Sequence, residues 1–287
     1  MKSKLIKLFN ISRPVSWVNT AYPFAAGYLL LGGSVDAIFI IGSLFFLIPY
    51  NLLMYGINDV FDYESDIRNP RKGSIEGAVE AKSFHPTIIT ASLVSTVPFA
   101  VAFAALIPTP AVITLASVLF FVVAYSIKGL RFKEKPFLDS ITSSIHFVGP
   151  LVVAAAILGF PVYVWPFVLA FFLWGMASHA FGAVQDIIPD RKGHISSIAT
   201  VLGARITIRL SVLLYLASVI IVGMEGGMSL AVAVAGLAYV ANIASYWRIT
   251  DKTSGAANKA WRRFIWINYA VGAIVTMALI THLWSGL

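Results

Sequence analysis

The chain has 287 residues, of which 59% are apolar and only 12% charged, and its mean hydropathy is +0.84. Uncharged runs of about 20 residues recur along it, which is typical of a polytopic membrane protein and excludes an ordinary soluble domain. The net charge of +8 is sorted along the chain in a way that indicates membrane topology and not nucleic-acid binding. The chain has no cysteine, which excludes disulfides, thiol catalysis and cysteine-ligated metals.

Apolar runs bounded by charges, glycine or proline predict nine membrane-spanning helices. In chain order the expected spans are residues 15–33, 37–57, 86–106, 110–127, 138–159, 162–182, 206–223, 228–247 and 264–283. The first span is led by Arg13-Pro14 and is expected to be retained, not cleaved as a signal peptide. We therefore expect an all-α bundle of nine transmembrane helices that forms a single domain over residues 1–287.

The positions of lysine and arginine predict the orientation of this bundle. All 21 basic residues precede the first span or follow an even-numbered span, whereas the opposite loops "GGSVDA", "IPTP", "GFPV" and "GMEGG" carry none. Cations near the ends of spans stay on the cytoplasmic side of the membrane. The sequence thus predicts a multi-pass protein of the cell membrane with a cytoplasmic N-terminus and an external C-terminus.

Two cytoplasmic loops are longer than the others, at residues 58–85 and 183–205. Each opens with carboxylates and continues with cations, as "NDVFDYESDIRNPRK" and "QDIIPDRKGH". Tyr55-Gly56 before the first acids recurs as Phe181-Gly182 before the second. This weak internal repeat predicts two related helical halves, at about 1–135 and 136–287.

The first acidic cluster follows the second span directly. If the helix of that span continues to residue 66, Asn58, Asp62 and Asp66 fall at positions i, i+4 and i+8, and Asp59 precedes Asp66 by seven residues. One broad face of the helix is then lined with oxygen ligands. Because like charges at this spacing repel each other, a positive partner is expected.

The second acidic cluster follows the sixth span, with Asp186 and Asp190 at i and i+4. Its third step is His194, where the first cluster has Asp66; a solvated loop histidine is the favoured reading there. Oxygen-only ligands suit a hard cation, and Mg²⁺ typically takes one or two carboxylates together with phosphate oxygens and water. We therefore expect the two clusters to face each other and to hold two Mg²⁺ ions around a diphosphate.

The pattern N-D-x-x-D-x-x-x-D at residues 58–66, the later D-x-x-x-D at 186–190 and the intervening "YSIKGLR" at 125–131 resemble the intramembrane prenyltransferases of the UbiA superfamily. The resemblance covers most of the chain and implies a UbiA-like bundle. Within the superfamily, the residues that flank both motifs and the opening segment "SRPVSWVNTAYPFAAGY" are most similar to lycopene elongases of carotenoid biosynthesis.

The resemblance also implies roles for individual residues. The metal ligands and catalytic carboxylates would be Asn58, Asp59, Asp62, Asp66, Asp186 and Asp190. The residues that bind the diphosphate would be Lys128 and Arg131, with Arg68, Arg71 or Lys72. Tyr125 would orient the diphosphate or shield the allylic cation with its ring.

The implied reaction is transfer of a dimethylallyl group from dimethylallyl diphosphate to the terminal double bond of lycopene, with Mg²⁺ as cofactor. The tertiary cation would end by water capture or proton loss, giving extended acyclic carotenoids of the flavuxanthin type. The acceptor would enter from the lipid bilayer, and other enzymes of the carotenoid pathway are candidate partners.

Several alternatives stay open at this point. The prenyl acceptor could be an aromatic quinone precursor or another lipid, and the protein could belong to another class as an ion-coupled transporter. Carboxylates at a span end can also be ordinary solvated loop charges, although two matched groups argue against that. His146 and His179 line the cavity or serve a structural role, and Asp139 is expected to be a helix N-cap.

Overall fold

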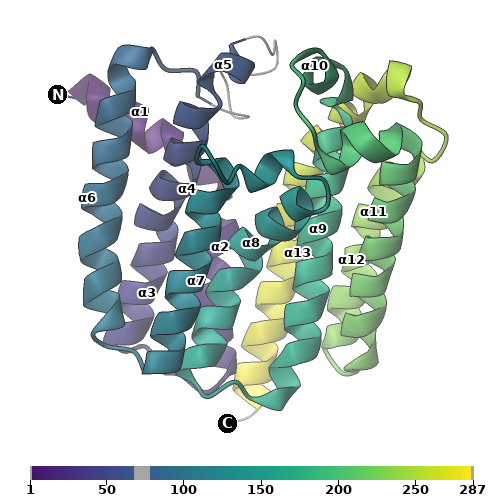
Figure 1. Cartoon of the computed structure of the whole chain (residues 1–287). Helices are drawn as coiled ribbons and strands as arrows, with labels where there is room; N and C mark the ends of the chain where they lie inside the picture. The colour runs from purple at the N-terminus through teal and green to yellow at the C-terminus, as the bar shows by residue number, and fades with distance from the viewer. Residues whose placement is uncertain (1, 68–77, 286–287) are drawn as a thin grey trace. The chain divides into compact units, whose positions relative to one another are not determined.

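The structure is a computed structural model that describes residues 2–67 and 78–285. Every regular element in these ranges is a helix, which confirms the all-α prediction (Figure 1). The chain divides into two compact units that we describe separately. Unit 1 contains Met1–Phe132 and Ile145–Pro161, and unit 2 contains Lys133–Ser144 and Val162–Leu287.

The helices up to the middle of the chain are α1 (Lys2–Ile11), η1 (Pro14–Ser16), α2 (Val18–Leu30), α3 (Ala37–Leu47), α4 (Pro49–Phe61), α5 (Tyr63–Asp66), η2 (Lys82–Phe84), α6 (His85–Ala104), α7 (Thr109–Ser126), η3 (Phe132–Glu134) and α8 (Leu138–Ile157). Those that follow are η4 (Val162–Val164), α9 (Trp165–Val184), α10 (Ile187–Lys192), α11 (Ile198–Met224), α12 (Ser229–Ala244), η5 (Asp251–Ala257) and α13 (Asn258–Ser285).

Within the described ranges, seven helical segments are long and apolar enough to cross a membrane. The expected spans at 15–33 and 228–247 are shorter helices, α2 with 13 residues and α12 with 16. The first is shortened because a 3-10 turn, η1, occupies Pro14–Ser16 before α2 begins. A multi-pass membrane protein is thus confirmed, while the count of nine spans and the orientation of the termini stay predictions.

Aromatic side chains from four helices form the core of unit 1. Phe24, Phe45, Phe46, Tyr50 and Phe103 are completely buried and come from α2, α3, α4 and α6. The ring centroid of Phe46 lies 5.2 Å from that of Phe24 and 5.2 Å from that of Tyr50. Large rings that meet edge to face combine area with specific geometry, so this cluster fixes how α4 lies in unit 1.

The second expected span contains a break between α3 and α4. Pro49 has no backbone N–H and therefore cannot continue the hydrogen bonds of α3. The amide of Asn51 donates to the carbonyl oxygens of Phe46 and Leu47 at 2.9 and 3.0 Å, and the hydroxyl of Thr20 also donates to Phe46. Neutral side chains thus bond the carbonyl groups freed at the break, as an apolar environment requires.

Asp36 directly precedes the same span and caps its first helix, α3. Its Oδ1 accepts a hydrogen bond from the backbone N–H of Phe39 at 2.8 Å, and Tyr28 donates its hydroxyl to Oδ2 at 2.9 Å. This is the side-chain cap that helix N-termini favour. The bond from Phe39 and the bond from Tyr28 hold the pKa of Asp36 below its ordinary value against a smaller effect of desolvation.

Unit 2 has a separate aromatic core. Phe181, Tyr215 and Tyr239 are buried, and the ring of Tyr239 lies 5.4 Å from that of Tyr215 and 5.7 Å from that of Trp174. The hydroxyl groups of Tyr215 and Ser178 share a hydrogen bond of 2.9 Å, which satisfies a polar group inside this core. The cluster packs α9, α11 and α12 together and so supports the end of α9 that carries the second acidic motif.

Candidate active site

The first acidic motif lies on a nearly continuous helix, as its spacing predicts. The backbone N–H of Asp62 donates to Asn58, and that of Asp66 donates to Asp62, each at 2.9 Å. Asp62 itself, at φ −96° and ψ −4°, is the junction between α4 and α5. The i, i+4 and i+8 relation of the three residues is therefore confirmed.

The carboxylates of this motif are buried in unit 1. Asp59, Asp62 and Asp66 are 4%, 6% and 7% exposed. Buried carboxylates at this density require positive partners or a cation, because removing each from water costs several kcal/mol, roughly.

Arg131, predicted to bind the diphosphate, lies beside Asp62. Its Nη2 is 3.6 Å from Asp62 Oδ1, and its Nη1 donates to the carbonyl oxygen of Phe61 at 3.3 Å. Ser126, at the end of α7, donates to Asn58 Oδ1 at 3.2 Å. The turn after α7 is thereby attached to the first motif, and it brings a guanidinium to the carboxylates.

A second arginine, which in the sequence looks like a topology signal only, contacts the motif at Asp59. Nη2 of Arg13 lies 2.7 Å from Asp59 Oδ1, and its guanidinium carbon is 4.1 Å from the ring centroid of Tyr55. The backbone N–H of Ala78 donates to Asp59 Oδ2 at 3.3 Å. Both carboxylate oxygens of Asp59 thus have partners within the protein, which makes them less available to a metal ion than the oxygens of an exposed carboxylate.

Both arginines have positive φ angles, 50° for Arg13 and 38° for Arg131. Residues with a side chain avoid this region, and such strain persists only where surrounding contacts hold it in place. The two strained arginines flank the same short stretch of α4, which marks this stretch as a candidate site.

The second acidic motif repeats the local construction of the first. The N–H of Asp190 donates to the carbonyl oxygen of Asp186 at 2.9 Å. Asp186, at φ −96° and ψ −2°, is the junction between α9 and the six-residue α10. By backbone conformation Asp186 therefore corresponds to Asp62 and Asp190 to Asp66, whereas the sequence comparison pairs His194 with Asp66. His194 is exposed after the end of α10, in agreement with a solvated loop histidine.

The glycine that precedes each motif lies at a close approach between helices. A Cβ added to Gly56 would come within 2.8 Å of Ser92 Oγ on α6, and one added to Gly182 would come within 2.9 Å of the Trp261 ring on α13. Each motif is therefore carried on a helix end that is packed tightly against its neighbour.

The remaining predicted residues differ in their placement. Tyr125 is half-buried, with its ring centroid 5.0 Å from that of His146, while Lys128 is exposed in the turn after α7. Arg68, Arg71 and Lys72 lie outside the described residues, so their roles stay predictions.

The intramembrane histidines and Asp139 have structural partners. His146 Nε2 lies 3.4 Å from the Phe121 carbonyl oxygen, and His179 Nδ1 lies 3.0 Å from Ser140 Oγ. Asp139 is completely buried, and its Oδ2 accepts the N–H of Ile198 at 2.7 Å. It thus accepts a free N–H at the start of α11, although Asp139 itself lies inside α8, which begins at Leu138.

The donor atoms of the two motifs suit Mg²⁺. Asn58, Asp62 and Asp66 offer oxygen only, and so do Asp186 and Asp190 in unit 2. In the described part of the chain, no group of three or more acidic or histidine side chains is placed to hold a metal by itself. Mg²⁺ fits such a set because it commonly binds through one or two carboxylates and completes its shell with water and phosphate oxygens.

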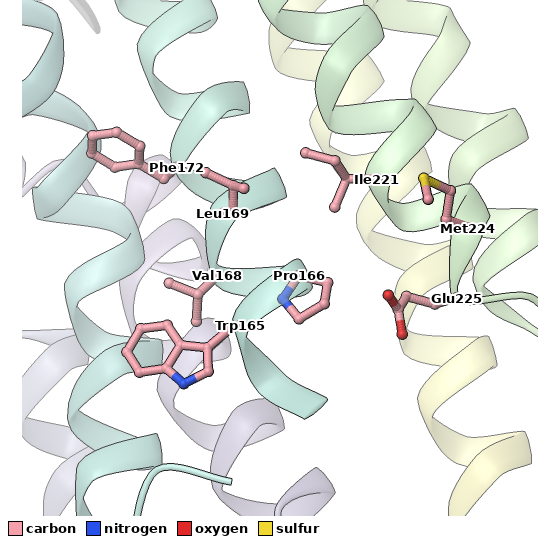
Figure 2. Close-up of a pocket in the computed structure, with 8 residues that line it drawn as sticks. All are labelled: Trp165, Pro166, Val168, Leu169, Phe172, Ile221, Met224 and Glu225. Carbon is pink, nitrogen blue, oxygen red and sulfur yellow. The ribbon is translucent and has the colours of Figure 1, made fainter. Parts of the chain in front are cut away.

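A groove of about 620 Å³ lies elsewhere in unit 2, between the first turns of α9 and the end of α11 (Figure 2). Its lining is apolar except for Glu225 at the rim; the lining residues are Trp165, Pro166, Val168, Leu169, Phe172, Ile221, Met224 and Glu225. The groove is at the end of α9 opposite Asp186, so it is separate from the acidic motif.

Comparison with known proteins decides which family this arrangement represents. The pattern of the UbiA prenyltransferase family matches residues 20–268. The chain belongs to this family. Like other UbiA members, it is a prenyltransferase and a multi-pass membrane protein.

Two relatives and one solved structure resemble the chain over nearly its whole length. It is 50% identical over 282 residues to a lycopene elongase/hydratase of Corynebacterium glutamicum, with 98% of each chain covered. It is 49% identical over 284 residues to a C(50) beta-cyclic carotenoids biosynthesis protein of a Dietzia species, covering 98% of this chain and 65% of that protein. The fold matches a UbiA homolog from Archaeoglobus fulgidus, solved with DMAPP and Mg²⁺, at a TM-score of 0.68 and 19% identity over 92% of this chain and 98% of that one.

Sequence reasoning missed Arg13 and Asp251 as partners of the motifs. Arg13 offered one usable signal, because a residue before proline is biased away from helical backbone angles, and Arg13 has φ 50° and ψ 72°. Asp251 lies 60 residues beyond its partner Arg191, and nothing in the local sequence indicates that pairing.

Proposed function

We propose that this UbiA prenyltransferase transfers the dimethylallyl group of dimethylallyl diphosphate to a terminal double bond of lycopene, in a reaction that requires Mg²⁺. The observation that carries the proposal is 50% identity, over 98% of both chains, to a lycopene elongase/hydratase. Two buried or half-buried acidic motifs with the same backbone construction support the diphosphate half of the reaction.

In this proposal the ligands of Mg²⁺ are Asn58, Asp62 and Asp66 of the first motif and Asp186 and Asp190 of the second. When bound, Mg²⁺ withdraws electron density from the leaving group and so favours breaking of the carbon–oxygen bond. Asp59, predicted as a further ligand, is engaged by Arg13 and Ala78, which favours a role in fixing the end of α4.

Basic residues then receive the leaving group. Arg131, held beside Asp62, donates hydrogen bonds to the departing diphosphate and offsets its charge. Lys128 is exposed in the same turn and provides a further cation, and the ring of Tyr125 faces the allylic cation. The less substituted carbon of the acceptor's terminal double bond uses the π electrons to bond the allylic carbon as the diphosphate leaves, and the tertiary cation left on the other carbon takes up water or loses a proton.

The test is expression of the protein in cells that accumulate lycopene, with the carotenoids analysed by mass spectrometry. We expect masses raised by one or two five-carbon prenyl units, with or without water, and no such products from Asp62→Ala or Asp186→Ala chains present in the membrane at the same level. Unchanged lycopene together with prenylation of an aromatic quinone precursor would contradict the acceptor and retain the reaction class. Absence of Mg²⁺-dependent diphosphate release with any acceptor would instead favour a transporter.

We also propose that the motifs face the cytoplasm. The absence of cysteine allows a direct test, because Glu225→Cys and Lys252→Cys each introduce the only thiol of the chain. Both positions are exposed. A membrane-impermeant maleimide added to intact cells is expected to label the first variant and not the second; the reverse pattern would contradict this orientation.

A further inference from the structure

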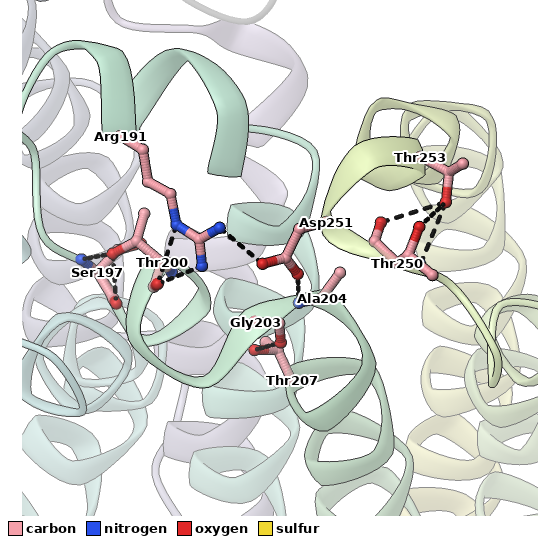
Figure 3. A network of polar contacts seen from close by, with 9 residues as sticks. All are labelled: Arg191, Ser197, Thr200, Gly203, Ala204, Thr207, Thr250, Asp251 and Thr253. Carbon is pink, nitrogen blue, oxygen red and sulfur yellow. Dashed lines mark hydrogen bonds and ion pairs between the residues drawn. The ribbon is translucent and has the colours of Figure 1, made fainter.

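Helix α11 is broken near its start. Gly203 has φ 76° and ψ 162°, far from helical values, so Ile198–Met224 consists of two helical parts. Only glycine adopts this region without strain. The break lies close to the second acidic motif along the chain, and Figure 3 shows the side chains gathered around it.

The Arg191–Asp251 ion pair takes the place of the backbone hydrogen bond that is lost at this break. In an unbroken helix the N–H of Ala204 would donate to the carbonyl oxygen of Thr200. Here the Ala204 N–H donates to Asp251 Oδ1 at 2.7 Å instead. The Thr200 oxygen accepts two bonds from Arg191, 2.7 Å from Nη2 and 3.2 Å from Nε.

The same two side chains bind each other and so close the bridge. Arg191 Nη1 donates to Asp251 Oδ2 at 2.6 Å (Figure 3). Arg191 belongs to α10 and directly follows Asp190, and Asp251 is the first residue of η5. The ion pair therefore joins the short helix of the second motif to the break in α11 and to the connection between α12 and α13.

This network suits a role in positioning better than a role in global stability. The side chains of Arg191 and Asp251 are 45% and 39% exposed, and exposed ion pairs add little to folding stability. The planar guanidinium nevertheless fixes three hydrogen-bond directions at once. A helix of six residues does not hold its own conformation in isolation, so α10 depends on such external contacts.

We propose that Arg191 and Asp251 are positioning residues that hold α10 in the orientation in which Asp186 and Asp190 bind the metal–diphosphate. The inference rests on the proposed function and deepens it, since it concerns the same site. Neither residue touches the substrate in this proposal. They act through the α11 break, and Gly203 is required because its conformation opens the space that the Asp251 carboxylate occupies.

Three substitutions test the network in different ways. Asp251→Asn keeps an oxygen that accepts the Ala204 N–H but places an amide NH₂ toward Arg191. It therefore removes the ion pair and keeps the hydrogen bond to Ala204 at the break in α11. Arg191→Lys keeps the charge but loses the fork that reaches Thr200 and Asp251 together. Gly203→Ala changes no charge, but its Cβ would approach Asp251 Oδ1 to 3.1 Å at a strained φ. The matched control is Glu225→Gln, an acid-to-amide change at the other end of α11.

The measurement is the thermal stability of the purified full-length protein in detergent, titrated with Mg²⁺ and inorganic pyrophosphate. We expect the three variants to melt within a few degrees of the wild type without ligand, and to need roughly 10-fold to 100-fold more Mg²⁺–pyrophosphate for half of the ligand-induced shift, the range typical of lost support around a metal site. The control is expected to titrate like the wild type.

The outcomes separate this inference from the proposed function. Variants that melt earlier but titrate like the wild type would overturn the positioning role and leave the proposed reaction intact. A wild type that responds to Mg²⁺–pyrophosphate, with weakened variants, supports the inference even if lycopene is not the acceptor. A wild type with no response at all would overturn both.

Discussion

The two acidic motifs share a backbone plan but differ in how the protein supports them. In each, an aspartate at nearly the same φ and ψ ends a long helix and begins a short one. The carboxylates of the first motif are buried, with Arg13 against Asp59 and Arg131 beside Asp62, whereas Asp186 and Asp190 are half-buried and the ion pair of the neighbouring Arg191 with Asp251 is exposed. A buried ion pair is therefore expected to matter more for folding than one that water reaches.

The largest effect is expected from the aspartate at each helix junction. Asp62→Asn and Asp186→Asn should each lower product formation by at least about 100-fold, because each removes a negative oxygen that holds the cation at the leaving group. Prenylated carotenoid per unit of membrane-inserted protein is the measurement, with Glu225→Gln as the control. If one variant keeps most of its activity, the two junction aspartates do not have equivalent roles in prenyl transfer.

A smaller effect on stability is expected from Arg13. Arg13→Gln leaves the buried carboxylate of Asp59 without its ion-pair partner and should lower the free energy of unfolding by about 3 kcal/mol. The double variant Arg13→Gln/Asp59→Asn replaces the ion pair with two neutral amides and should recover part of that loss. Unfolding in denaturant measures both.

The corresponding change in the second motif sharpens the contrast. Arg191→Gln should cost no more than about 1 kcal/mol of unfolding free energy, since that pair is exposed. Equal losses for Arg13→Gln and Arg191→Gln would show that burial does not govern the support of the motifs.

Asp36 provides a reference carboxylate that accepts hydrogen bonds from neutral groups. Its folded pKa lies below the ordinary value because the Phe39 N–H and the Tyr28 hydroxyl bond to it. Its stabilising contribution is therefore present above pH of about 3.9 and is lost as the pH falls through the lowered folded pKa. The melting temperature of the wild type should exceed that of Asp36→Asn near neutral pH, and the difference should shrink in acid. A difference that grows in acid would contradict the assignment.

The smallest effect is expected from Glu64, which lies between Asp62 and Asp66 in sequence. Its side chain is 64% exposed and pairs with the equally exposed Lys82. Glu64→Gln should change the free energy of unfolding by less than about 0.5 kcal/mol and leave prenyl transfer unchanged. A large loss of stability or of prenyl transfer would mean that the position of Glu64 among the acids matters more than the burial of its side chain.

Local regularities could be predicted from the sequence, while distant contacts could not. The spacing of Asn58, Asp62 and Asp66 requires only the geometry of one helix, so its prediction is confirmed by backbone hydrogen bonds. The break at Pro49 is visible in principle, because proline interrupts a helix, but the uncharged run at 37–57 predicts a single span. The start of α11 at Ile198, eight residues before the expected span, was also signalled by Ser197 and Thr200, which form a capping box.

Contacts between elements far apart in sequence were not predictable from local patterns. Asp59 meets Arg13 across 46 residues, and Asp251 meets Arg191 across 60. In the sequence, Arg13 and Arg191 look like the other cations that mark the cytoplasmic side. Their roles depend on packing, which a single sequence does not reveal.

The two helix breaks also differ in how they respond to dissolved electrolyte. Amide and hydroxyl dipoles bond the break at Pro49 and are buried, so added salt leaves them unaffected. The break at Gly203 depends on two opposite charges that water reaches, and mobile ions weaken such an attraction over a Debye length of about 8 Å at physiological ionic strength. We therefore expect concentrated salt to weaken the Arg191–Asp251 pair next to the second motif and to leave the hydrogen bonds at the Pro49 break unchanged.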